Sequence, residues 1–94
     1  MVCSKFEYSN HAVAQMFRRG ISVDEVEAAI TLGGTIKDYP QDTPFPSQLK
    51  LYFAGNVRPI HVVVSQDAAT GTCYIITAYE PDAAIWQPDF RNKL

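Results

Sequence analysis

Two histidines, two arginines, a tyrosine and a glutamate are the side chains of this sequence that could carry out chemistry. They lie in three segments: His11 and Arg19 in the first, Arg58 and His61 in the second, and Tyr79 and Glu80 in the third. Imidazole and carboxylate groups transfer protons near neutral pH, and guanidinium groups stabilise the charge that develops on a phosphate. The six residues therefore form a candidate catalytic set for metal-free chemistry on a phosphodiester.

Each of these side chains also has a structural interpretation. His61 is flanked by β-branched residues, a pattern typical of a partly buried, hydrogen-bonded histidine within a strand. Arg58 precedes that strand and is suited to an ion pair at its entrance. His11 begins a predicted helix, where it is either a base or a residue that caps the first turn. Tyr79 is suited to packing at a sheet edge as well as to contact with a substrate.

A helix is predicted over residues 10–19. Its apolar side is expected to consist of Ala12, Val13, Met16 and Phe17, and its polar side of His11, Gln15, Arg18 and Arg19. Ser9 or Asn10 can cap its first turn, and Gly20 is placed to end it. The polar side is the part of this helix that could face a substrate.

A second helix is predicted from Ser22 to about Leu32. Ser22 and Glu25 have the spacing of a capping box, in which each side chain bonds the backbone N–H of the other residue. The expected apolar stripe is Val23, Val26, Ala29 and Ile30. Gly33-Gly34 is expected to end the helix.

After Gly34 the spacing of apolar residues changes from helical to alternating, which indicates strands. The predicted strands cover residues 35–39, 48–54, 59–65 and 72–79. The expected fold is a single α+β domain over residues 1–94, with two N-terminal helices packed on a three- to four-stranded antiparallel sheet. Trp86, in the loop that follows, is expected to cover the core or to anchor a partner.

The composition narrows the class of protein. The net charge of −2 disfavours a general nucleic-acid-binding protein, which would usually be basic, although a local basic patch remains compatible with it. No spacing of histidines and cysteines indicates zinc, and no cofactor is expected. Cys3 and Cys73 are expected to be free thiols. Without a signal peptide or an apolar run of membrane-spanning length, a cytoplasmic protein is expected.

These segments together resemble a bacterial family of uncharacterised proteins, the domain-of-unknown-function family 4258. The resemblance is carried by His11-Ala12, Met16, Arg19, Ile21-Ser22, the Val26/Ile30 stripe, residues 58–63 and residues 76–82 with Trp86. The layout is similar to that of small bacterial toxins of the RelE and BrnT type, which cleave RNA without a metal through residues borne on their sheet. The resemblance implies such a toxin-like role only at the level of the fold. This chain departs from the pattern because it is acidic and has few basic residues on its sheet.

Two functions are compatible with the sequence. The first is a toxin-like RNA endonuclease, in which His11, His61 or Glu80 takes the proton of a ribose 2′-OH and Arg58 or Arg19 stabilises the phosphorane. The second is a non-catalytic interaction module, or a toxin-derived domain without activity, that pairs with a partner through an edge strand. The corresponding partners are RNA, a small antitoxin-like protein and a second copy of the chain.

Overall fold

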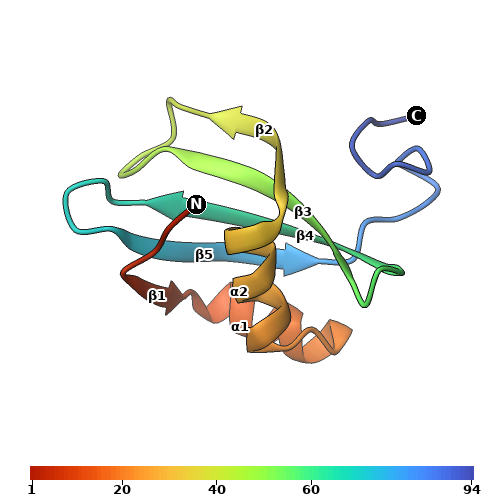
Figure 1. The fold of residues 1–94 in the computed structure, drawn as a ribbon, viewed down its shortest axis with the longest axis horizontal. Coiled ribbons are helices and arrows are strands. Elements are labelled where there is room, and N and C mark those ends of the chain that lie inside the picture. Colours follow the sequence, from red (N-terminus) through yellow and green to blue (C-terminus); the bar gives the residue numbers. More distant parts are fainter.

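The computed structural model describes residues 1–94 as two helices and one five-stranded sheet (Figure 1). The elements in chain order are β1 (Lys5–Tyr8), α1 (Asn10–Arg19), α2 (Val23–Leu32), β2 (Gly34–Tyr39), β3 (Ser47–Ala54), β4 (Arg58–Gln66) and β5 (Thr72–Tyr79). The mixed α+β class is confirmed, and both helices and the four predicted strands lie within a residue or two of their expected bounds. No helix is both long enough and apolar enough to cross a membrane.

The sheet has one strand more than was expected. Its order is β1-β5-β4-β3-β2, and its last four strands pair antiparallel. β1 pairs parallel with β5, with Lys5 opposite Thr72 and Tyr8 opposite Ile75. The prediction of three or four antiparallel strands was therefore wrong at this edge. Four residues that lead directly into a helix cap are too short to show an alternating pattern.

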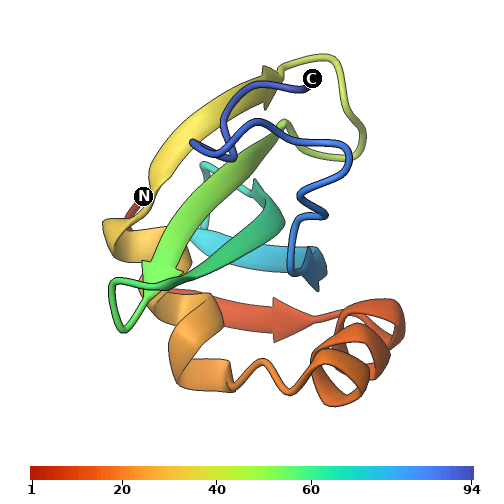
Figure 2. The same ribbon diagram turned by 90° about the vertical axis from the view of Figure 1, so that its right-hand side faces the viewer.

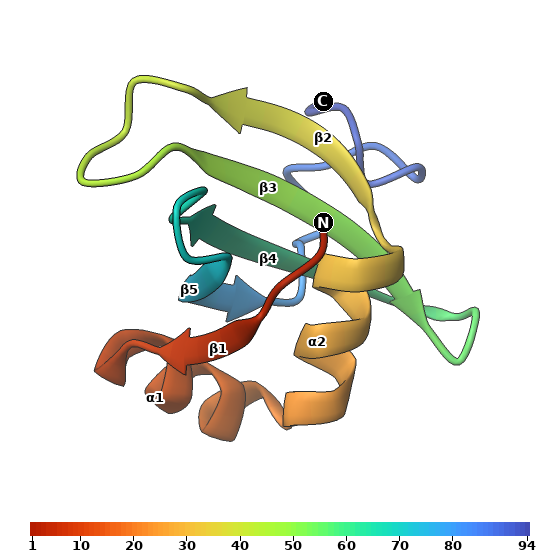
Figure 3. The ribbon, with the colours of Figure 1, turned by 60° about the vertical axis from the view of Figure 1, so that its left-hand side comes forward.

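Different parts of the chain cover the two faces of the sheet (Figures 2 and 3). Both helices pack on one face, and residues 80–94 fold back over the other. Along β4 the fully buried Ile60, Val62 and Val64 join the helices in one apolar core. His61 points to the opposite face, because neighbouring side chains in a strand alternate. The C-terminal segment is therefore the layer that encloses His61.

The predicted ends of α1 are confirmed, whereas its predicted apolar side is only half correct. Ser9 caps the helix by accepting from the N–H of Ala12, and Gly20 ends it in the left-handed conformation at φ 64°. Ala12 and Met16 are buried, but Val13 is 52% exposed and Phe17 91% exposed. Only Ala12 and Met16, which are four residues apart, face the sheet. Val13 and Phe17 lie one residue further round the helix, where no element covers them.

The predicted capping box of α2 is confirmed. The Ser22 hydroxyl accepts from the N–H of Glu25 at 3.0 Å, and the Glu25 carboxylate accepts from the N–H of Ser22 at 2.9 Å. Gly33 ends the helix, as expected, without adopting a left-handed conformation. Its φ is −71°, but a Cβ there would lie 2.3 Å from the carbonyl oxygen of Ala29 and 2.6 Å from that of Leu51. Glycine is needed because α2 and β3 meet at this point.

Replacing Ser22 with alanine should lower the free energy of unfolding by roughly 0.5–2 kcal/mol, because the side-chain half of the capping box is lost. Ser22→Thr keeps a hydroxyl at the same position and is the matched control. Urea unfolding followed by circular dichroism would measure both variants. Equal losses in the two variants would show that the hydroxyl does not stabilise α2.

The two cysteines form a disulfide, so the expectation of free thiols was wrong. Cys3 and Cys73 are bonded across a sequence separation of 70 residues, with their Cα atoms 5.6 Å apart. The parallel pairing of β1 with β5 places Cys3 beside the start of β5, and Ser4 N–H donates to the carbonyl of Gly71 at 2.9 Å. Sequence separation alone could not indicate this contact, because it depends on the unpredicted strand.

Candidate active site

A groove lies between α1, the end of β5 and the C-terminal segment. Its volume is about 590 Å³, and it is lined by His11, Gln15, Arg19, Thr77, Tyr79, Glu80, Asp82, Ile85, Trp86 and Lys93. Four of the six residues predicted from the sequence are in this lining, from two segments far apart in the chain. The remaining two, His61 and Arg58, lie behind it and contact residues of its wall.

The helix wall of the groove follows directly from the sequence. His11, Gln15 and Arg19 are spaced four residues apart, so they form one row along α1. All three line the groove, while the neighbouring Arg18 is exposed and does not. The predicted polar side of α1 is thus split, and only one of its two arginines faces the site.

His61 is fully buried and links Tyr79 to the C-terminal segment. Its Nε2 lies 2.8 Å from the carbonyl oxygen of Phe90, and its Nδ1 lies 3.2 Å from the Tyr79 hydroxyl. A carbonyl oxygen can only accept, so Nε2 carries the proton and the neutral ring accepts at Nδ1. The Tyr79 hydroxyl therefore donates to His61. The edge of the imidazole also meets Trp86, with ring centroids 4.6 Å apart.

Burial keeps both members of this pair uncharged. Loss of solvent lowers the pKa of His61, although the Phe90 carbonyl partly opposes the shift. Burial also raises the pKa of Tyr79, which stays a protonated phenol at neutral pH. In this arrangement His61 fixes the orientation of Tyr79 and does not itself reach the groove.

Acidification should destabilise the fold through His61. Because the folded pKa lies below the unfolded value near 6.5, the unfolded chain binds more protons between these two pKa values. Stability should be complete above the unfolded pKa and fall as the pH drops towards the folded pKa, by at most about 1.4 kcal/mol per pH unit.

Urea unfolding at about pH 7.5 and about pH 5 would test this contribution of histidine burial. The difference in stability between the two conditions should shrink in His61→Gln and persist in His11→Gln, which replaces the exposed histidine. An unchanged difference in His61→Gln would contradict the assignment of the pH dependence to His61.

Arg58 holds three elements together. Its Nε donates to Glu80 at 2.9 Å, and its terminal nitrogens donate to the carbonyls of Gly20 at 3.0 Å and Arg19 at 2.6 Å. The carbonyls are those left free at the end of α1, where a cation is favourable. Glu25 is a weaker partner at 3.9 Å. This network ties Glu80 and the end of α1 that carries Arg19 to one side chain.

The sequence analysis did not identify the C-terminal side of the site. Lys93 and Trp86 line the groove together, and the Lys93 ammonium lies 5.6 Å from the centre of the Trp86 ring. An isolated bridge pairs these two residues within a segment that has no repeating pattern. The signal in this segment was Trp86, the single tryptophan of the chain, which was expected to cover the core or to anchor a partner. Within residues 1–94, no group of three or more His, Cys, Asp and Glu is placed to hold a metal ion.

These features define a small α+β protein whose polar groove combines proton-transfer groups, cations and aromatic rings. The chain belongs to the family described as "Domain of unknown function (DUF4258)", whose model matches residues 8–80. That match contains all six residues predicted from the sequence. No curated protein and no solved structure matches the chain.

Proposed function

We propose that this protein is a toxin-like RNA endonuclease that works without a metal. The observation that carries the proposal is the groove that gathers His11, Arg19, Tyr79 and Glu80 beside Lys93. A proton acceptor can activate a 2′-OH, two cations can stabilise a phosphorane, and an aromatic ring can stack on a nucleobase. RNA is thus the proposed substrate and the cytoplasm the proposed compartment.

In the proposed reaction, His11 takes the proton from a ribose 2′-OH. The 2′ oxygen then forms a bond to the adjacent phosphorus, and the bond from phosphorus to the 5′ oxygen breaks. Arg19 and Lys93 stabilise the negative charge of the phosphorane between these events. The leaving oxygen takes a proton from water, because the groove is open to solvent. The products are a 2′,3′-cyclic phosphate and a 5′-hydroxyl end.

The other four predicted residues have supporting roles in this proposal. His61 accepts from the Tyr79 hydroxyl, so the Tyr79 ring is held at the wall where a base can stack. Arg58 binds both Glu80 and the end of α1, so it acts on the site through its neighbours. We therefore treat His61 and Arg58 as positioning residues, whereas Glu80 lines the groove and remains a second candidate base.

The alternative is an interaction module that binds an antitoxin-like protein or a second copy of the chain. The exposed Phe17 and Val13 on α1 are the observation that favours it. Trp86, the anchor expected from the sequence, is used within the fold instead, because it packs on His61. Phe90, in the same segment, likewise packs on Phe53. The β2 edge carries a register shift between Thr35 and Lys37, a feature that discourages edge pairing.

Purified protein incubated with a mixed RNA pool, with and without EDTA, would test the proposed activity. Cleavage should be equal in both conditions, because proton transfer and charge stabilisation come from side chains. The new 3′ ends should be 2′,3′-cyclic phosphates. Absence of cleavage, or cleavage abolished by EDTA, would overturn the proposal.

A further inference from the structure

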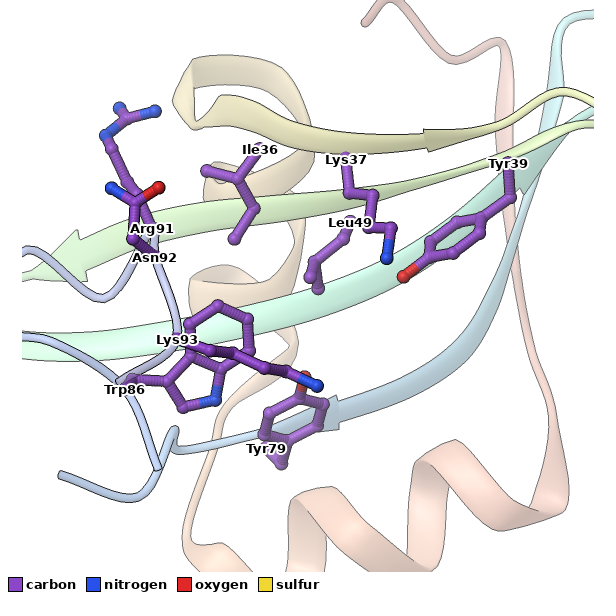
Figure 4. A pocket seen from close by; sticks show the side chains of 9 residues that line it. All are labelled: Ile36, Lys37, Tyr39, Leu49, Tyr79, Trp86, Arg91, Asn92 and Lys93. Carbon is purple, nitrogen blue, oxygen red and sulfur yellow. The ribbon is translucent and has the colours of Figure 1, made fainter. Parts of the chain in front are cut away.

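A second cavity lies beside the groove, between the β2–β3 side of the sheet and the C-terminal segment (Figure 4). Its volume is about 290 Å³, at the lower end of the range for small-ligand pockets. Tyr79, Trp86 and Lys93 line both spaces and form the wall between them. The cavity therefore continues the groove across the sheet.

The cavity is positively charged in an acidic protein. Lys37, Arg91 and Lys93 line it, and no carboxylate does. None of these three side chains forms an ion pair, since every ion pair of the fold involves Lys5 or Arg58. Three of the eight lysines and arginines thus gather around one space, with the Asp89 carboxylate near Arg91 as a nearby negative charge. Such a site attracts an anion.

Apart from Asn92, the rest of the lining is aromatic or aliphatic. Tyr39 and Tyr79 stand at different ends of the cavity, and Ile36 and Leu49 line its sheet side, with Ile36 on the side away from Tyr39 (Figure 4). The Lys37 ammonium lies 5.5 Å from the centre of the Tyr39 ring, so a cation and an aromatic face are adjacent. A small molecule that carries both a planar ring and a phosphate would match the aromatic faces and the cations of this lining.

We propose that this cavity binds one nucleotide unit, with its base among the aromatic and aliphatic side chains and its phosphate near Lys37 and Lys93. The unit is either a free nucleoside monophosphate or a residue of single-stranded RNA. In the second case the strand crosses Trp86 and Lys93, and its neighbouring phosphate enters the groove. That path rests on the proposed endonuclease function, whereas nucleotide binding in the cavity does not.

The test is a binding titration that uses the fluorescence of Trp86 as its readout. Trp86 is the single tryptophan and lines the cavity. The probes are adenosine 5′-monophosphate, adenosine, inorganic phosphate, phenyl phosphate and the dinucleotide ApA. Adenosine 5′-monophosphate should bind at about 1 mM or tighter, and more tightly than adenosine, phosphate or phenyl phosphate. Tighter binding of ApA would identify an RNA strand as the source, and weaker binding a free nucleotide.

Lys37→Gln and Lys93→Gln should each weaken the binding of adenosine 5′-monophosphate by roughly tenfold, because each removes a charge-assisted contact. Arg18→Gln, which removes an exposed arginine that lines neither the cavity nor the groove, is the matched control and should leave binding unchanged. Absence of binding overturns the proposal, and so does phenyl phosphate binding as tightly as the nucleotide. Weakening by Arg19→Gln alone would assign the ligand to the groove and would also overturn it. This titration does not measure cleavage, so its result does not depend on whether the protein cleaves RNA.

Discussion

Arg19→Ala should slow RNA cleavage by about 10²–10³-fold, whereas Arg18→Ala should cleave at the wild-type rate. The two arginines are neighbours at the end of the same helix, and both are exposed, but only Arg19 lines the groove. Removing one donor that stabilises a developing oxyanion has a cost of this size. The Arg19 backbone carbonyl, which binds Arg58, is retained in the variant. Initial rates on a fluorescent RNA oligonucleotide would measure both variants.

Equal rates for the two arginine variants would contradict the placement of the phosphate in the groove. His11→Ala extends the test to proton transfer and should lower the rate by about 10²–10⁴-fold. Glu80→Gln separates the two candidate bases. If Glu80→Gln lowers the rate as much as His11→Ala does, the Glu80 carboxylate takes part in proton transfer. An unchanged rate in both variants would exclude both His11 and Glu80 as the base.

Breaking the disulfide should lower the free energy of unfolding by roughly 4 kcal/mol, which is the loop-entropy value for a closed loop of 70 residues. Cys3→Ser is the suitable variant, because Cys3 is partly exposed, whereas Cys73 is fully buried in the core. Replacing Cys73 would add the separate cost of a polar atom in an apolar site. Guanidinium unfolding with and without dithiothreitol would measure the difference.

The wild-type protein should lose stability when the reductant is added, and Cys3→Ser should not respond to it. A wild-type protein that is equally stable under both conditions would contradict a stabilising disulfide. A stabilising disulfide would count against the proposed cytoplasmic location, since glutathione and thioredoxin keep most cytosolic thiols reduced.

The parts of the fold that were predicted correctly are those with local signals. Ser22 and Glu25 mark the start of α2 through bonds between residues three apart, and Gly20 ends α1 through its own backbone conformation. The alternation around His61 likewise predicts which face of β4 its ring occupies. Each of these features depends on a few consecutive residues, so no knowledge of the tertiary fold is needed.

The parts that were missed depend on contacts between distant residues. Whether His61 reaches a substrate depends on Phe90 and Trp86, which cover it from a segment without periodicity. Similarly, nothing near Arg58 in the chain indicates that its donors bind the end of α1. The sequence analysis therefore identified the residue types of the groove but not which of them face its interior.

The parallel pairing of β1 with β5 has a consequence for synthesis on the ribosome. Lys5 emerges 67 residues before its partner Thr72, a delay of roughly 3–13 s at ordinary elongation rates. During that time both helices can form, but the β1 edge has no strand to join. A nascent chain of this protein therefore exposes an unpaired segment and an apolar helix face together. Residues 5–19 are therefore a segment that chaperones could bind before β5 is made.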